Sequence, residues 1–343
     1  MATPLSANLR FLVGKLESSP GSLATLTSED FNVRIKDPVV THEVELDDEN
    51  AKWARGDHGE EFSITGVKTA TVTFSIRCVT GATAAAAPNW AKFLKACGQK
   101  EIAYTTTGIG WQPRKDCDAI TITLAIYDLE MGATPKALCT TIKGCVGNCV
   151  IGADGVGKPW LATYSFRGVI SSVADVANAS LLMPYVIDTQ CADKMLSNVA
   201  YVGAVPEKIS SFSLDYGNEI NPVYDQSDAS GVAYFAITAR RPRLSMNPLA
   251  TVAATRDVWT QWTSGTTGPC STMPLGIGDT GDDRKFFVLA PKTQLLTSPM
   301  AIREGLVSWD QNYKLLPNGV TGSLTDDDLA AETTVELLQG KRA

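Results

Sequence analysis

The commonest local pattern in this chain of 343 residues is an alternation of apolar and polar side chains. In residues 66–78, GVKTATVTFSIRC, the apolar Val72, Phe74 and Ile76 alternate with threonine and serine. A period of two is typical of a strand that buries one face, so the sequence predicts a mostly β protein. Further strands are expected at 31–46, 119–127, 137–151, 158–170, 208–224, 231–241, 273–278, 284–291, within 301–316 and at 333–338.

Two short helices are expected to interrupt this β pattern. Residues 88–98, PNWAKFLKACG, place Trp90 and Phe93 on one helical face, between a proline start and a glycine end. We expect these rings to be core residues on a sheet rather than a ligand platform. A second helix is expected within residues 247–262, NPLATVAATRDVWTQW, with a shared face of Leu249, Val252, Trp259 and Trp262.

The order of these elements repeats along the chain. Residues 231–241, GVAYFAITARR, resemble 66–77, and each half reads as strand, polar loop, glycine-led strand, short helix and further strands. We interpret this as two tandem units, the alternative being one large α+β domain whose halves are alike by chance. The expected division is an N-terminal arm outside the core at 1–30, a first domain at 31–175, a connection at 176–206 and a second domain at 207–343.

A long charged segment follows the first predicted strand. Residues 47–65 are too polar to pack and too long for a tight turn, so we interpret them as an arm that orders against a neighbouring subunit. The alternative is a floppy surface loop. The arginines at and just after the end of the 231–241 strand are expected to pair with acidic residues in the same chain or across an interface. The candidate contact residues are therefore Asp47, Asp48, Glu49, Trp53, Arg55, Asp57, His58, Glu60, Glu61, Arg240, Arg241 and Arg243.

Charge and cysteine content narrow the class of protein. The net charge of −7 argues against an electrostatic nucleic-acid binder, although an acidic wall suits a surface that DNA only passes. No apolar run is long enough to span a bilayer, and residues 1–21 lack the apolar core of a signal peptide. We therefore expect no membrane association, and we expect the eight cysteines to be free and mostly buried.

Residues for catalysis are sparse. Two histidines are few for general acid–base chemistry, and His58 has no serine or cysteine placed to form a recognisable triad. The glycine-containing segments 155–160 and 276–283 lack the spacing of a phosphate-binding loop and are better interpreted as hairpin turns. We expect no enzyme activity, no metal site and no cofactor.

Several of these segments together resemble the tail tube proteins of long-tailed bacteriophages. The resemblance runs through GKLESSPG, FNVRI, EFSITGVKTATVTFSIRC and APNWAKFLKACG, and continues in ITITLAIYDLEMG, LCTTIKGCVGNCVI and GKPWLATYSFRGVI. The second half adds FSLDYGNEINPVYDQSDASGVAYFAITARRPRLSMNP, similar to the opening hairpin of another such domain. These are loose patterns rather than a catalytic signature, and they cover most of the chain.

The resemblance implies an α+β, mostly β fold of two tandem β-sandwich or β-barrel domains, each with a short flanking helix. It implies a virion protein, assembled in the host cytoplasm, whose rings stack into a tube for DNA, with the loop at 47–65 reaching the adjacent ring. Members with one domain form hexameric rings, so two domains per chain favour a trimer. The implied partners are further copies of itself, a tape measure protein, and tail terminator or baseplate proteins, with non-specific passage of DNA. The alternatives are a tail terminator, another ring-forming tail or baseplate protein, or an unrelated enzyme.

Overall fold

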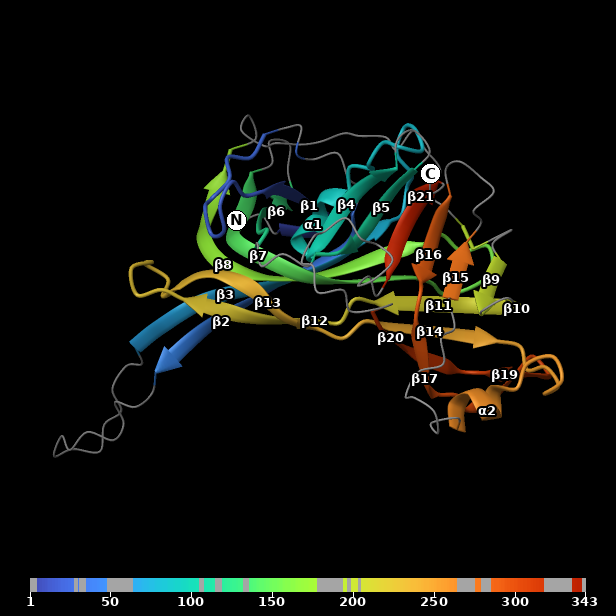
Figure 1. Ribbon diagram of the computed structural model, residues 1–343. Coiled ribbons are helices and arrows are strands. Elements are labelled where there is room, and N and C mark those ends of the chain that lie inside the picture. The colour runs from blue at the N-terminus through green and yellow to red at the C-terminus, as the bar shows by residue number, and fades with distance from the viewer. Residues whose placement is uncertain are drawn as a thin grey trace, which may run out of the picture.

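The structure, a computed structural model, describes residues 5–27, 30, 35–47, 64–104, 108–114, 119–131, 136–177, 194–195, 199–202, 205–263, 275–278, 285–317 and 335–340. Within these residues the fold is mostly β, which confirms the prediction from alternation. It consists of two larger antiparallel sheets, two two-stranded ribbons and two short helices (Figure 1). Neither larger sheet closes into a barrel within the described residues.

The larger sheet has ten strands and follows the order β17-β20-β14-β11-β7-β8-β3-β2, with β6 and then β1 branching from β7. Its strands are β1 (Leu5–Leu16), β2 (Ile35–Asp47), β3 (Ile64–Arg77), β6 (Ile122–Glu130), β7 (Ala137–Ala153), β8 (Leu161–Val176), β11 (Ile209–Asp215), β14 (Arg243–Pro248), β17 (Thr293–Thr297) and β20 (Gln311–Leu315).

The second sheet has seven strands in the order β10-β9-β15-β16-β21-β5-β4, so the last strand of the chain joins strands from both halves. These strands are β4 (Gln99–Tyr104), β5 (Gly108–Pro113), β9 (Val199–Val202), β10 (Val205–Glu207), β15 (Leu275–Gly278), β16 (Phe286–Ala290) and β21 (Glu336–Gly340).

The two ribbons and two helices flank the sheets. One ribbon pairs β12 (Asn218–Tyr224) with β13 (Val232–Arg240), and the other pairs β18 (Met300–Arg303) with β19 (Leu306–Trp309). The helices are α1 (Ala91–Ala96) and α2 (Val258–Thr263). α1 and the ribbon β12–β13 lie on opposite faces of β7 and β8 (Figure 1).

The main core lies between the two sheets and contains α1. Phe93 of the helix packs against Phe74 of β3 and Tyr164 of β8, with ring centroids 5.2 and 5.6 Å apart. Trp90, at the start of the helix, packs against Phe286 of β16 in the other sheet. Edge-to-face and tilted pairs of this kind add to the stabilisation from burial. The expectation that Trp90 and Phe93 are core residues is therefore confirmed.

The strand order of the larger sheet repeats between the two halves of the chain. In the first half, the four strands β2, β3, β7 and β8 have the sheet order β7-β8-β3-β2. If these four are numbered 1 to 4 along the chain, their order across the sheet is 3-4-2-1. In the second half, β11, β14, β17 and β20 have the sheet order β17-β20-β14-β11, which is again 3-4-2-1. Each helix also lies between the second and third of these strands in the chain. The two sets join where β11 pairs with β7.

Some expectations from sequence are wrong. Residues 1–30 are not wholly outside the core, because β1 pairs with β6 and buries Leu12 and Val13. The second helix covers only residues 258–263, since 243–248 belong to β14, and of its expected shared face Val252, Trp259 and Trp262 are exposed. The segments that form β1, β4, β5, β9, β10 and β17 were not expected to be strands.

Candidate assembly site

One face of the larger sheet carries hydroxyl and amide side chains that bond from strand to strand. On β3 and β8 the hydroxyls of Ser75 and Thr163 lie 2.9 Å apart. At the other end of the sheet Ser245 of β14 donates to Asn312 of β20, which in turn donates to Thr297 of β17. The opposite face of the same strands enters the aromatic core. The sheet therefore has one dry face and one polar face, which suits an antiparallel sheet with a hydrated side.

The ribbon β12–β13 covers part of this polar face with apolar side chains. Val232 and Phe235 are almost fully buried against Val146 of β7 and Val169 of β8. The guanidinium group of Arg167 lies 5.4 Å from the centre of the Phe235 ring, a cation–π contact at the border of the cluster. The ribbon is thus attached to the first-half strands, although it belongs to the second half of the chain.

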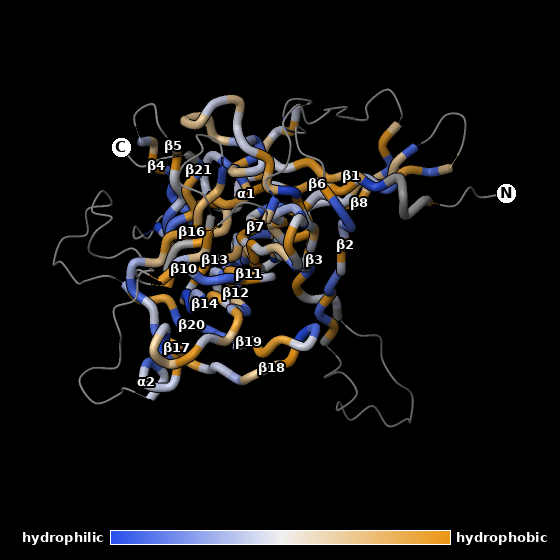
Figure 2. The backbone as a smooth tube through the Cα atoms, turned by 90° about the vertical axis from the view of Figure 1, so that its right-hand side faces the viewer, coloured by the Kyte–Doolittle hydropathy of each residue, from blue (hydrophilic) through white to orange (hydrophobic). Residues whose placement is uncertain are grey.

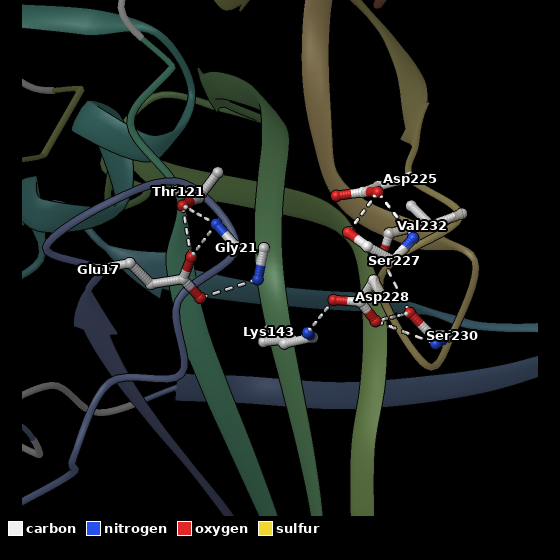
Figure 3. A network of polar contacts seen from close by, with 10 residues as sticks. Glu17, Gly21, Thr121, Lys143, Asp225, Ser227, Asp228, Ser230 and Val232 are labelled. Atoms are coloured by element: carbon white, nitrogen blue, oxygen red, sulfur yellow. Dashed lines mark hydrogen bonds and ion pairs between the residues drawn. The ribbon is translucent and has the colours of Figure 1, made fainter.

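The tip of the ribbon is held by a salt bridge (Figure 3). Lys143 Nζ lies 2.6 Å from Oδ2 of Asp228. The same carboxylate accepts hydrogen bonds from the backbone and hydroxyl of Ser230. The hydrogen bond from Lys143, followed by those from Ser230, lowers the pKa of Asp228 to about 2. The bonded, charged form of this carboxylate therefore favours the docked ribbon.

Beside this salt bridge, Glu17 organises the bulge of β7 (Figure 3). Its carboxylate accepts hydrogen bonds from the backbone of Gly144, the backbone of Gly21 and the hydroxyl of Thr121. Gly144 has φ +61°, and a Cβ there would lie 2.8 Å from the Cα of Tyr234 in the ribbon. Glycine therefore meets two needs at this bulge, a left-handed conformation and a close backbone approach.

The three candidate arginines point to different neighbours. Arg240 donates to the backbone carbonyl of Arg114, and Arg241 forms an exposed ion pair with Glu219 at 3.6 Å. Arg243 lies in β14, opposite Asp215 in register. The structure thus gives Arg241 an acidic partner within the chain and does not gather the three side chains into one site. Of the other candidates, Asp47 ends β2, and Asp48, Glu49, Trp53, Arg55, Asp57, His58, Glu60 and Glu61 lie outside the described residues.

The larger sheet ends in two outer edges. β2 pairs only with β3, and β17 pairs only with β20, among the described strands. The edge of β2 contains Pro38 and a register shift, and Arg10 donates to the Pro38 carbonyl. Proline and bulges are features that limit uncontrolled pairing at a sheet edge. An outer edge at each end is a requirement for a sheet that continues into a neighbouring molecule.

Two hollows lie outside the core. A groove of about 300 Å³ separates the β2–β3 hairpin from the ribbon and is lined partly by Glu43, Arg167 and Tyr224. A second hollow, of about 350 Å³, lies beside α1, where burial lowers the pKa of Lys92 to about 8. Within the described part of the chain, no three histidine, cysteine or acidic side chains are grouped to hold a metal ion.

The cysteines that the structure describes agree with the expectation from sequence. Cys78, Cys97, Cys139, Cys145 and Cys149 are free and buried, and burial raises the pKa of Cys97, Cys145 and Cys149 well above the usual value for a thiol. Cys117, Cys191 and Cys270 lie outside the described residues. None of the helices in the described ranges is both long and apolar enough to cross a membrane.

No protein-family model matches this chain, and no curated protein sequence matches it. The arguments for function therefore depend on the residues and their arrangement alone. Sequence reasoning missed the docked ribbon and the two sheet edges, the features that bear most on assembly. The one available signal was Gly144 and Gly147 within the strand pattern of 137–151, because glycine inside a strand suggests a bulge or a close backbone approach. It does not identify the ribbon as the partner.

Proposed function

We propose that this protein is the subunit of a hollow tail tube of the long-tailed bacteriophage type. In this proposal the two halves of the chain are tandem tube domains, and three copies close head to tail into a ring of six halves. Rings stack into the conduit through which DNA leaves the virion. The observation that carries the proposal is the repeated strand order, together with the internal junction at which β11 pairs with β7.

The pairing of β11 with β7 suggests how neighbouring chains would join to close the ring. β11, the first of the four repeated strands in the second half, pairs antiparallel with β7, the third of the four in the first half. Phe212 lies opposite Ala153 and Asp215 opposite Val150. The equivalent strands at the two ends of the sheet are β2 and β17. If β2 of one copy pairs with β17 of the next, the same junction recurs between chains. A heterologous contact of this kind generates a closed ring when its rotation permits.

The two faces of the sheet suit the two sides of such a ring. The hydroxyl and amide face, represented by Ser75, Ser245 and Asn312, would line the lumen, and the face that packs on the helices would lie outside. Hydroxyls and amides hold water without attracting phosphates, and a net charge of −7 opposes adhesion of DNA. In the second half Ser245 of β14 continues this sheet face, whereas β13 belongs to the separate ribbon.

Electron microscopy of the purified full-length protein tests this proposal. Stacked rings with a central hole are the expected result. Single rings that never stack would favour a tail terminator or another ring-forming tail protein instead. A protein that stays monomeric at every concentration examined, including high protein concentration, would refute both.

A further inference from the structure

The helix α2 presents two tryptophan side chains to solvent. Trp259 is 67% exposed and lies edge-to-face with Trp262 at 6.0 Å between ring centroids. Trp262 is oriented by a hydrogen bond from its indole nitrogen to the carbonyl of Leu296 in β17. Only Val258 of this helix is buried. Large exposed aromatic side chains held beside an outer sheet edge are typical of a protein–protein contact.

The first-half helix α1 shows which element is contacted by a helix at this place in the strand order. α1 lies between the second and third repeated strands, as α2 does, and its C-terminal end meets the hairpin of the other half. Asn218 donates to the carbonyl of Cys97 at 2.8 Å, and Ile237 and Arg240 fill the space beside Gly98. These residues belong to the ribbon β12–β13, and β12 directly follows β11, the strand that pairs with β7.

We infer that the tryptophans of α2 form a docking shelf for strand β2 of a second copy of this chain. This inference rests on the proposed ring, in which β2 of the next copy pairs with β17. The part of β2 that follows its bulge then reaches α2, as Asn218 reaches α1. That part of β2 exposes apolar surface, since Val44 is 48% exposed and lies opposite Lys68 in register. It is on the same face as the partly buried Val40, which pairs with the core residue Val72.

The shelf and the strand are at opposite ends of the molecule. In Figure 1, α2 lies near β17, at the far side of the sheet from β2 and β3. Figure 2 also places α2 and the hairpin β18–β19 at the end away from β1 and β6. The two surfaces therefore cannot cover one another within one chain, whereas a head-to-tail arrangement brings them together in every copy.

A mixing experiment tests the contact directly. Thr263→Cys, at the end of α2, and Val44→Cys are prepared as separate full-length variants, mixed during assembly and treated with a short bismaleimide crosslinker. We expect covalent dimers from the mixture, and none above the wild-type background from either variant alone. A Val156→Cys variant, exposed on the β7–β8 loop, replaces Val44→Cys in the control mixture. Rings that form without any specific dimer in the first mixture would overturn the inference.

Substitution gives a second, independent readout. Trp259→Ser should raise the protein concentration needed for ring formation about tenfold, which corresponds to about 1.4 kcal/mol, because tryptophan is enriched among the few interface residues that carry most of the binding energy. Val156→Ser is the matched control, since Val156 is 62% exposed but lies in the β7–β8 loop and not in α2 or β2, and it should leave that concentration unchanged. If wild-type rings form and both variants behave alike, the shelf is wrong and the tube proposal stands. If the wild type forms no rings, both fail.

Discussion

The buried ion pair between Arg256 and Glu207 offers the most quantitative test of how the second half is held together. Both side chains are almost inaccessible, at 2% and 3% exposure, and Nη1 of Arg256 lies 3.0 Å from Oε1 of Glu207. Nη2 of the same guanidinium donates to Gln311 at 2.9 Å and to the hydroxyl of Tyr313 at 2.7 Å. The arginine thus connects β10 of one sheet with β20 of the other, directly before α2.

Arg256→Ala should lower the free energy of unfolding by about 3–5 kcal/mol, because it leaves the Glu207 carboxylate buried without its counter-ion. The two other partners contribute less to this cost. The Tyr313 hydroxyl donates to Gln311 at 2.7 Å, so these two side chains keep a hydrogen bond when the arginine is absent. Replacing both charges, as Arg256→Met with Glu207→Leu, should return stability to within about 1.5 kcal/mol of wild type, since the buried charge is then absent.

Urea unfolding, followed by circular dichroism at a protein concentration below assembly, measures these differences. Arg241→Ala is the matched control, because its ion pair with Glu219 is exposed at 3.6 Å and should contribute less than about 0.5 kcal/mol. The reasoning is refuted if Arg256→Ala costs no more than this control. It is also refuted if the double variant is as unstable as Arg256→Ala, since the cost would then not come from the stranded carboxylate.

Three further outcomes follow from the ribbon and the charged segment. Gly144→Ala should destabilise the protein by about 1–3 kcal/mol, because the residue has a positive φ and lies against the ribbon backbone. Limited proteolysis should therefore cleave the ribbon faster in this variant. Unchanged protection of the ribbon would contradict the prediction. The folded-state pKa of Asp228 is lowered to about 2, so the salt bridge with Lys143 should stabilise the fold by about 1 kcal/mol above about pH 4 and lose this contribution as pH falls toward 2. Asp228→Asn should remove that part of the pH dependence in unfolding titrations, and an unaltered profile would count against the salt bridge. Replacing 48–63 by a short turn should leave rings that do not stack in electron micrographs; long tubes from this variant would exclude a stacking role.

Regular alternation made some elements predictable from sequence. The strand at 66–78 was recognisable because Val72, Phe74 and Ile76 all face one core while their neighbours face water. β1 was not recognisable, because adjacent residues Leu12 and Val13 enter two different apolar clusters and the period of two disappears. A strand that is buried on both faces carries no alternation to detect.

The assembly site was less predictable because its contacts join distant residues. The salt bridge that holds the ribbon connects Lys143 with a residue 85 positions away. The strand at 231–241 was expected from its pattern, but its place in a ribbon outside the sheet was not. The chain leaves the sheet at Gly217, with φ +60°, between β11 and β12, and the ribbon packs against β7 and β8. Helical periodicity likewise placed Trp259 on an apolar helix face, and tertiary structure leaves that side chain exposed. Periodicity identifies the apolar face of a strand or helix, but it does not identify the partner that covers that face.

The number of chains in one ring tests the central claim most directly. Native mass spectrometry of rings dissociated from tubes should give three times the mass of one chain, because two repeated strand sets per chain supply six positions. A mass of six chains would contradict the equivalence of the two halves, and a mass of one chain under all assembly conditions would contradict ring formation itself.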